Sequence, residues 1–217
     1  MSISPQVNEQ ELPTMRSMTG PDVERAAAEA VSALAPHTGR DWRVPAGSLD
    51  WSCWTTAAHI AHDLTAYAFQ VASRAGSGYL PLDLRVRPDT PPAEVLTAVS
   101  AGARLLSAAV AAADPADRAW HWGPCDPAGF AAMGVAELLL HTYDIAQGLG
   151  LDWLPPEEPS AGVLARLFPD VRVGGPSAPG LLWAAGRIAL PERPRRTSWS
   201  WRAALTDPPA AGAETVR

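Results

Sequence analysis

Apolar side chains recur at intervals of three and four residues along four long segments of this chain. This spacing places them on one side of an α-helix, and it is the main sequence signal for an amphipathic helix. The clearest example is the second segment, where an apolar stripe runs from Trp54 to Ala72. We therefore expect four long helices, over residues 21–34, 50–74, 92–113 and 127–148.

Capping residues mark the ends of these segments. Pro21 stands at the start of the first, and Asp126 followed by Pro127 starts the fourth, as a cap followed by proline in the first turn. Pro115 closes the third segment, and Gly148 closes the fourth.

The link between the second and third helices, residues 75–91, is long enough to change the topology. Fully extended, it reaches roughly 55 Å, whereas a helix over residues 50–74 is about 37 Å long. The link can therefore run the length of a bundle and leave these two helices parallel. We predict a mainly α fold, a four-helix bundle with a long crossover between helices two and three.

After Gly150 the chain becomes rich in proline and the long periodic pattern ends. Short helices are expected at 161–167 and 179–190, and the alternation around Trp199–Trp201 indicates a short strand or edge segment. We expect this part to pack on the bundle as a small extension. The predicted organisation is an N-terminal tail at 1–19, the bundle at 20–150, the extension at 151–207 and a disordered tail at 208–217.

Composition narrows the function. The 217 residues carry a net charge of −6 and contain no lysine, which argues against a nucleic-acid partner and excludes Schiff-base or P-loop lysine chemistry. Cys53 and Cys125 form no CxxC pair, and we expect both to be free thiols. No secretory signal or membrane span is apparent, so a cytoplasmic protein without a membrane partner is expected. Nine tryptophans are available for core or pocket walls.

The residues most capable of chemistry lie in the fourth predicted helix. Glu137 and His141 are four apart and share one face, and Asp144 continues that face. Their neighbours are apolar, so the charged groups need a partner. A divalent metal held by Glu137, His141 and His62 of the second helix would provide one, with a coordination position left open for chemistry. Alternatively, Glu137 bonds His141 within one helix and no metal is needed.

Two motifs resemble a known family. The segment from Trp54 to His62 is similar to the start of the second helix in the DinB superfamily, where a Trp precedes a metal-binding His by eight positions. Residues Glu137 to Ala146, read as Glu, three residues, His, two residues, Asp-Ile-Ala, resemble a signature of the mycothiol-dependent maleylpyruvate isomerase branch. The segments 181–187 and 199–201 are similar to tails of actinobacterial members.

The resemblance implies a metal site made of His62, Glu137 and His141, with Asp144 orienting a ligand. Zinc is the usual metal, and the ligand set also permits nickel, iron or manganese. It further implies a small thiol cosubstrate, mycothiol, whose thiolate attacks a small electrophilic metabolite in S-transfer or cis–trans isomerisation. Two alternatives stay open: a thiol-independent hydrolase or isomerase using metal-bound hydroxide, and a non-catalytic metal- or ligand-binding bundle.

Three other residues are candidates for the same pocket. His59, one turn before His62, can line the cavity or replace His62 as a ligand, although a non-ligand role is favoured. His121 belongs to an aromatic connector that forms either a pocket wall or a packed link. Arg187 is the best counterpart of an active-site Arg that the isomerase takes from a larger C-terminal domain. The partners expected are a small-molecule substrate and a small thiol, with the chain as a monomer or homodimer.

Overall fold

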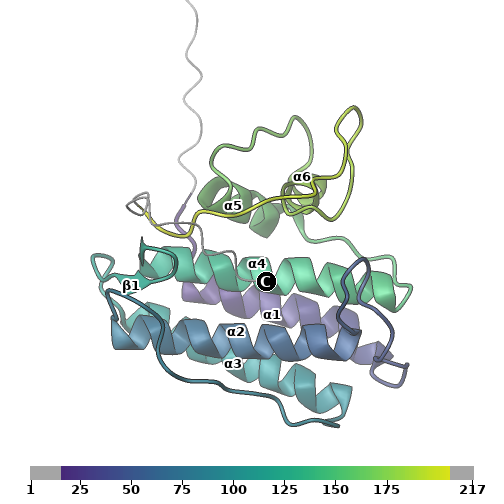
Figure 1. Cartoon of the computed structure of the whole chain (residues 1–217), viewed down its shortest axis with the longest axis horizontal. Helices are drawn as coiled ribbons and strands as arrows, with labels where there is room; N and C mark the ends of the chain where they lie inside the picture. Colours follow the sequence, from purple (N-terminus) through teal and green to yellow (C-terminus); the bar gives the residue numbers. More distant parts are fainter. Residues whose placement is uncertain (1–15, 206–217) are drawn as a thin grey trace, which may run out of the picture.

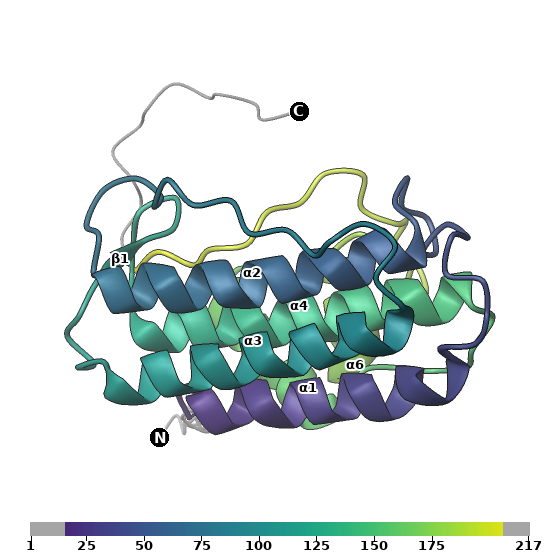
Figure 2. The same ribbon diagram turned by 90° about the horizontal axis from the view of Figure 1, so that it is seen from below.

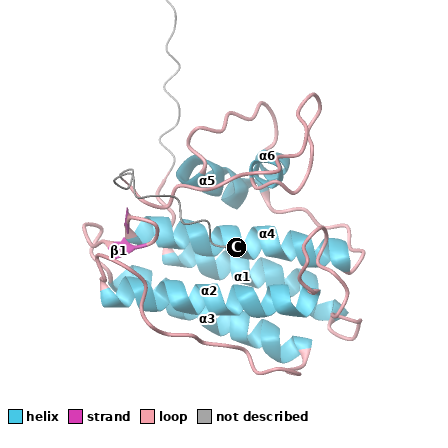
Figure 3. Cartoon of the chain, viewed as in Figure 1, coloured by secondary structure: helices cyan, strands magenta, loops and turns pink. Residues whose placement is uncertain are grey.

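The computed structural model describes residues 16–205 and is mainly helical, as predicted (Figure 3). The four long helices lie close to the predicted positions. Helix α2 begins three residues later than expected, because the Ser52 side chain accepts a hydrogen bond from the Thr55 amide and caps it. The Asp126 side chain accepts from the Gly129 amide in the predicted cap of the last helix. The observed bounds are Gly20–Leu34 for α1, Cys53–Ser73 for α2, Pro92–Ala112 for α3 and Pro127–Gly148 for α4.

These four helices lie side by side (Figures 1 and 2). Helices α2 and α3 run in the same direction, and the crossover, residues 75–91, returns along the outside of the bundle. Helix α2 packs against α3 and α4, and α1 packs against the same two helices. This arrangement places one face of α2 against α4, where the candidate site is found.

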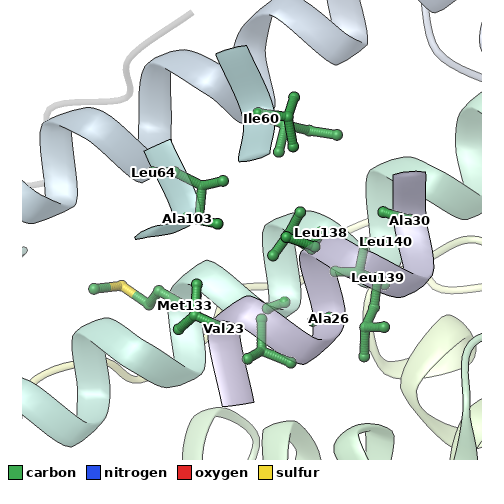
Figure 4. Close-up of a cluster of buried hydrophobic side chains, with 14 of the residues drawn as sticks. Val23, Ala26, Ala30, Ile60, Leu64, Ala103, Met133, Leu138, Leu139 and Leu140 are labelled. Atoms are coloured by element: carbon green, nitrogen blue, oxygen red, sulfur yellow. The ribbon is translucent and has the colours of Figure 1, made fainter. Parts of the chain in front are cut away.

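Helix α4 is the centre of the core. Residues 129–142 are all buried, because α1 and α2 cover one side and the C-terminal extension covers the other. Met133 and Leu138 of α4 meet Val23 of α1 and Leu64 of α2 (Figure 4). A helix buried on all sides is expected to be apolar all round, so the polar residues of α4 stand out.

Helices α2 and α3 approach closely at Gly102. A Cβ atom there would lie 3.1 Å from Leu64 Cβ and 3.3 Å from the Ala61 carbonyl oxygen. The missing side chain lets the two helices pack tightly, and this fixes the rotation of α2 about its axis.

The C-terminal extension crosses over α4 (Figure 1). Helix α5 spans Glu157–Leu167 and begins four residues before the predicted start, whereas α6, Ser177–Ala184, ends before the predicted 190. The shorter α6 has a local cause, because Gly186 adopts a positive φ of 72° that stops the helix.

The strand prediction was wrong. No strand forms at Trp199–Trp201; instead β1, Ala119–Trp120, pairs antiparallel with β2, Pro124–Cys125. The turn between them is made by Trp122 and Gly123, both at positive φ. The predicted tails fall mainly on residues 1–15 and 206–217, which lie outside the described residues.

Helix α3 is long and apolar enough, by length and composition alone, to cross a membrane, which the sequence analysis did not foresee. Within the structure it packs against α1 and α2. Core helices of soluble proteins pass the same test, so this is weak evidence for a membrane span.

Both cysteines are free, as predicted, and both are buried. Burial raises the pKa of Cys53 to about 11 and that of Cys125 to about 12. Both thiols are therefore protonated at neutral pH.

Asp22 ties the start of α1 to the chain before it. Its carboxylate accepts hydrogen bonds from the Thr19 amide at 2.8 Å and from Arg16 at 2.7 Å, and it also pairs with Arg25. Burial opposes ionisation of Asp22, but the bonds from Arg16 and Thr19 outweigh it and hold its pKa well below the usual range.

Replacing this carboxylate should destabilise the fold. We expect Asp22→Asn to lower the free energy of unfolding at pH 7 by about 1–3 kcal/mol, measured by urea denaturation. Because the folded-state pKa is depressed, the contribution is present above the unfolded pKa of about 4 and is lost as the pH falls below it. The difference in the free energy of unfolding between wild type and variant should therefore decrease as the pH falls from 5 to 2. Exposed Asp152→Asn is the control, and a difference that stays constant with pH would contradict the assignment.

Candidate metal centre

Helix α4 supplies two of the site residues one turn apart. His141 Nε2 lies 3.2 Å from Glu137 Oε2, and both side chains are buried. The spacing predicted from the sequence therefore brings an imidazole and a carboxylate together in the core of the molecule.

The third member of the cluster is His59 of α2. Its Nε2 lies 3.6 Å from Glu137 Oε2, and its ring stands edge-on to that of His141 with centroids 5.1 Å apart. One ligand atom from each of these three residues lies within 4.8 Å of the others. The cluster thus offers two imidazole nitrogens and one carboxylate oxygen at a common point.

His62 does not belong to this cluster, which corrects the ligand set expected from the sequence. His62 Nδ1 lies 2.7 Å from the carbonyl oxygen of Leu84 in the crossover. The physical reason is the rotation of α2, which turns position 59 toward α4 and position 62 toward the crossover.

Two further polar residues of α2 join the site and were missed by the sequence analysis. The Tyr67 hydroxyl donates to Glu137 Oε1 at 3.2 Å, and Asp63 Oδ2 lies 3.3 Å from His59 Nε2. A signal was available, because positions 59, 63 and 67 are each four apart and share one helix face.

Burial and pairing set the charges of the cluster. Burial disfavours the charged form of Glu137, but hydrogen bonds from His141 and His59 hold its pKa below the usual range. Burial likewise opposes protonation of His141, yet Asp144 and Glu137 raise its pKa to about 9. Burial and the neighbouring Glu137 charge raise the pKa of Asp63 to about 7. Glu137 therefore carries a full negative charge that needs a cation or a proton beside it.

Asp144 contacts His141 on the ring nitrogen that does not face Glu137, and Arg187 in turn contacts Asp144. Asp144 Oδ2 lies 3.0 Å from His141 Nδ1 and 2.9 Å from a guanidinium nitrogen of Arg187. Arg187 also donates to the Ala185 carbonyl oxygen at 2.8 Å. A carboxylate on Nδ1 fixes the ring orientation and leaves Nε2 toward Glu137, which is how carboxylates commonly orient metal-binding histidines. The structure thus places Asp144 and Arg187 next to the cluster.

The cluster opens into a pocket of about 580 Å³, called here the metal pocket. His59, Glu137 and His141 lie in its wall together with Asp63, Tyr67 and His121. The C-terminal extension adds two arginines and two tryptophans, so the bundle and the extension build the pocket jointly. These four residues are Arg187, Arg195, Trp199 and Trp201.

The donor set suits a divalent metal. A metal would displace the proton that His141 holds in its absence. Two neutral imidazoles and one carboxylate are then a common ligand set for zinc and for other first-row metals, and three protein ligands leave a position for a further ligand. His59, Glu137 and His141 all line the metal pocket, which provides space beside the cluster. A metal-binding histidine also needs a fixed ring orientation, and the contact between Asp144 and His141 Nδ1 provides it.

The comparison with known families agrees with this geometry. A family model described as "Mycothiol maleylpyruvate isomerase N-terminal domain" matches residues 23–146, from the first turn of α1 to the last turn of α4. No curated protein and no solved structure matches the chain.

The two candidate histidines of α2 can be separated by metal content. We expect about one zinc ion per chain in the wild type, loss of most of it in His59→Ala, and retention in His62→Ala, because only His59 faces Glu137. Elemental mass spectrometry of gently purified protein measures this, with circular dichroism to confirm folding. Loss of zinc in His62→Ala with retention in His59→Ala would restore the ligand set expected from the sequence.

Proposed function

The chain belongs to the family of the mycothiol maleylpyruvate isomerase N-terminal domain, and from this we propose that it is a metal-dependent cytoplasmic enzyme. In this proposal His59, Glu137 and His141 hold a divalent metal, zinc foremost. A small thiol, mycothiol, is the cosubstrate, and a small electrophilic metabolite is the substrate. The reaction is S-transfer to that electrophile or its cis–trans isomerisation.

One observation carries the proposal. Three side chains of types that can bind a metal, from two helices, converge within 4.8 Å in the wall of a pocket of about 580 Å³. Structural metal sites are closed by four protein ligands, whereas catalytic sites keep a position open. A cluster of three that faces a pocket of ligand size is the arrangement expected of a catalytic site.

The metal supplies one piece of chemistry, since a bound zinc ion lowers the pKa of a coordinated thiol and so favours the nucleophilic thiolate. The protein residues prepare for this step. Tyr67 holds Glu137 Oε1 through its hydroxyl, and Asp144 holds His141 Nδ1. Both contacts fix the direction in which the ligand atoms point.

Arg187 and Arg195 also line the metal pocket and add positive charge to its wall. Arg187 is almost fully buried and is kept in place by Asp144, so its guanidinium is preorganised. We propose that these arginines attract an anionic group of the substrate or thiol, in the way that guanidinium groups recognise carboxylates.

Thiol dependence tests the reaction class. We expect the zinc-loaded protein to convert conjugated electrophiles only when a low-molecular-weight thiol is added. Glu137→Gln should lower kcat/KM at least a hundredfold, because it removes the charged ligand. The assay follows loss of electrophile absorbance with and without mycothiol, against Glu94→Gln on the exposed surface as control. Full activity without thiol would support the metal-hydroxide alternative instead.

Asp144 offers a separate test of how His141 is supported. Asp144→Asn should weaken zinc binding about 10–100-fold, the usual cost of losing such a partner of a metal-bound histidine. Competition with a chromogenic chelator measures the affinity, and Asp152→Asn serves as the matched exposed control. Unchanged affinity would show that Asp144 only stabilises the fold.

A further inference from the structure

A second cavity of about 240 Å³ lies next to the metal pocket. It is called here the crossover pocket, because the crossover forms its outer wall. The two cavities share three lining residues, Asp63, Tyr67 and His121. The two cavities therefore adjoin each other at these side chains.

The remaining walls of the crossover pocket are mostly apolar. The bundle supplies one side and the crossover the other, with Ala66, Phe69, Phe130, Leu80, Leu82 and Leu84 as the apolar lining residues. An apolar cavity of about 150 Å³ is large enough to bind benzene. The crossover pocket therefore has room for one ring and a small substituent.

The outer wall is held in place by side chains of α2. The Gln70 amide group donates to the Gly78 carbonyl oxygen at 2.9 Å and accepts from the Leu80 amide at 3.2 Å. His62 bonds the Leu84 carbonyl oxygen, and Trp54 Nε1 donates to the Thr90 carbonyl oxygen at 2.7 Å. These contacts follow the crossover from one end to the other. The cavity is thus preformed, which lowers the entropic cost of binding.

His121 lines both cavities, and one of its ring nitrogens lacks a hydrogen-bond partner within the described part of the chain. It is about nine-tenths buried, and its Nδ1 has no hydrogen-bond partner among residues 16–205. Its ring packs edge-on against Tyr67 and Tyr79, with centroids 5.5 and 5.8 Å apart. A buried polar atom without a partner costs free energy. Nδ1 is closed to solvent in this conformation, and a turn of the His121 ring toward the cavity would let a polar ligand atom supply the missing partner.

We propose that the crossover pocket binds the apolar part of the electrophile, an aromatic ring or a branched alkyl group of about six to eight heavy atoms, whose polar substituent bonds His121. The proposal rests on the proposed function, because it assigns the electrophile to one cavity and the thiol to the other. The larger cavity contains the arginines and the metal cluster and suits a polar thiol, whereas the smaller one suits an apolar acceptor. The substrate class is therefore an aryl- or alkyl-substituted electrophile.

Binding of two small probes tests the pocket without metal or thiol. We expect 4-fluorophenol and fluorobenzene to bind the full chain saturably at millimolar concentration, followed by fluorine NMR. Ala66→Phe, which fills the cavity, should weaken both at least tenfold, whereas Ala101→Phe on the exposed face of α3 should not. Zinc content and circular dichroism of Ala66→Phe show that the metal cluster and fold persist. Absence of binding to the wild type, or equal binding to Ala66→Phe, would overturn the proposal.

The role of His121 is read from the ratio of the two affinities. The wild type should favour 4-fluorophenol over fluorobenzene several-fold, and His121→Phe should abolish this preference while fluorobenzene still binds. An unchanged preference in His121→Phe would overturn the assigned contact.

A kinetic comparison links the pocket to the reaction. With mycothiol and zinc, the ratio of kcat/KM for benzylideneacetone to that for methyl vinyl ketone should fall at least tenfold in Ala66→Phe. An unchanged ratio would overturn the assignment of the electrophile to this cavity. If neither compound reacts while the probes bind as expected, the cavity is confirmed as an apolar binding site and the thiol-dependent reaction is the part that fails.

Discussion

The carboxylate of Glu137 is a full charge inside a helix that is buried on almost every side, and the surrounding site is organised by the cost of that burial. Three side chains reach this carboxylate: His141 from the same helix, and His59 and Tyr67 from α2. The bundle must therefore hold α2 and α4 in one register. The same charge explains why Asp144 is needed, because the imidazole beside Glu137 has to present a defined nitrogen.

The sequence predicted those features that depend on one helix at a time. The four long helices follow from periodicity and caps, and the Glu137–His141 pair follows from a spacing of four. The choice between His59 and His62 was missed, because it depends on how α2 is rotated against its neighbours. That rotation is fixed by tertiary packing, such as the close approach of α2 and α3 at Gly102. The eight-residue spacing from Trp54 to His62 is also real, but in this structure both side chains hold the crossover.

The parts of the two pockets that irregular segments form could not be predicted from the spacing of apolar residues, because these segments have no repeating pattern. The crossover pocket owes its outer wall to residues 75–91, whose path is set by single hydrogen bonds from α2 rather than by a ladder. The strand expected at Trp199–Trp201 does not form within residues 16–205, and the side chains of Trp199 and Trp201 line the metal pocket instead. Alternation alone cannot distinguish a strand from an extended segment that packs through its side chains.

The state of the two cysteines matters for the proposed reaction, in which an electrophile is bound. Cys53 and Cys125 are buried and protonated at neutral pH, and the chain contains no lysine. The two kinds of side chain that reactive carbon compounds most readily modify are thus either enclosed or missing. In the proposed reaction the competent sulfur nucleophile belongs to the cosubstrate, and the protein is protected from alkylation by the compound that it binds.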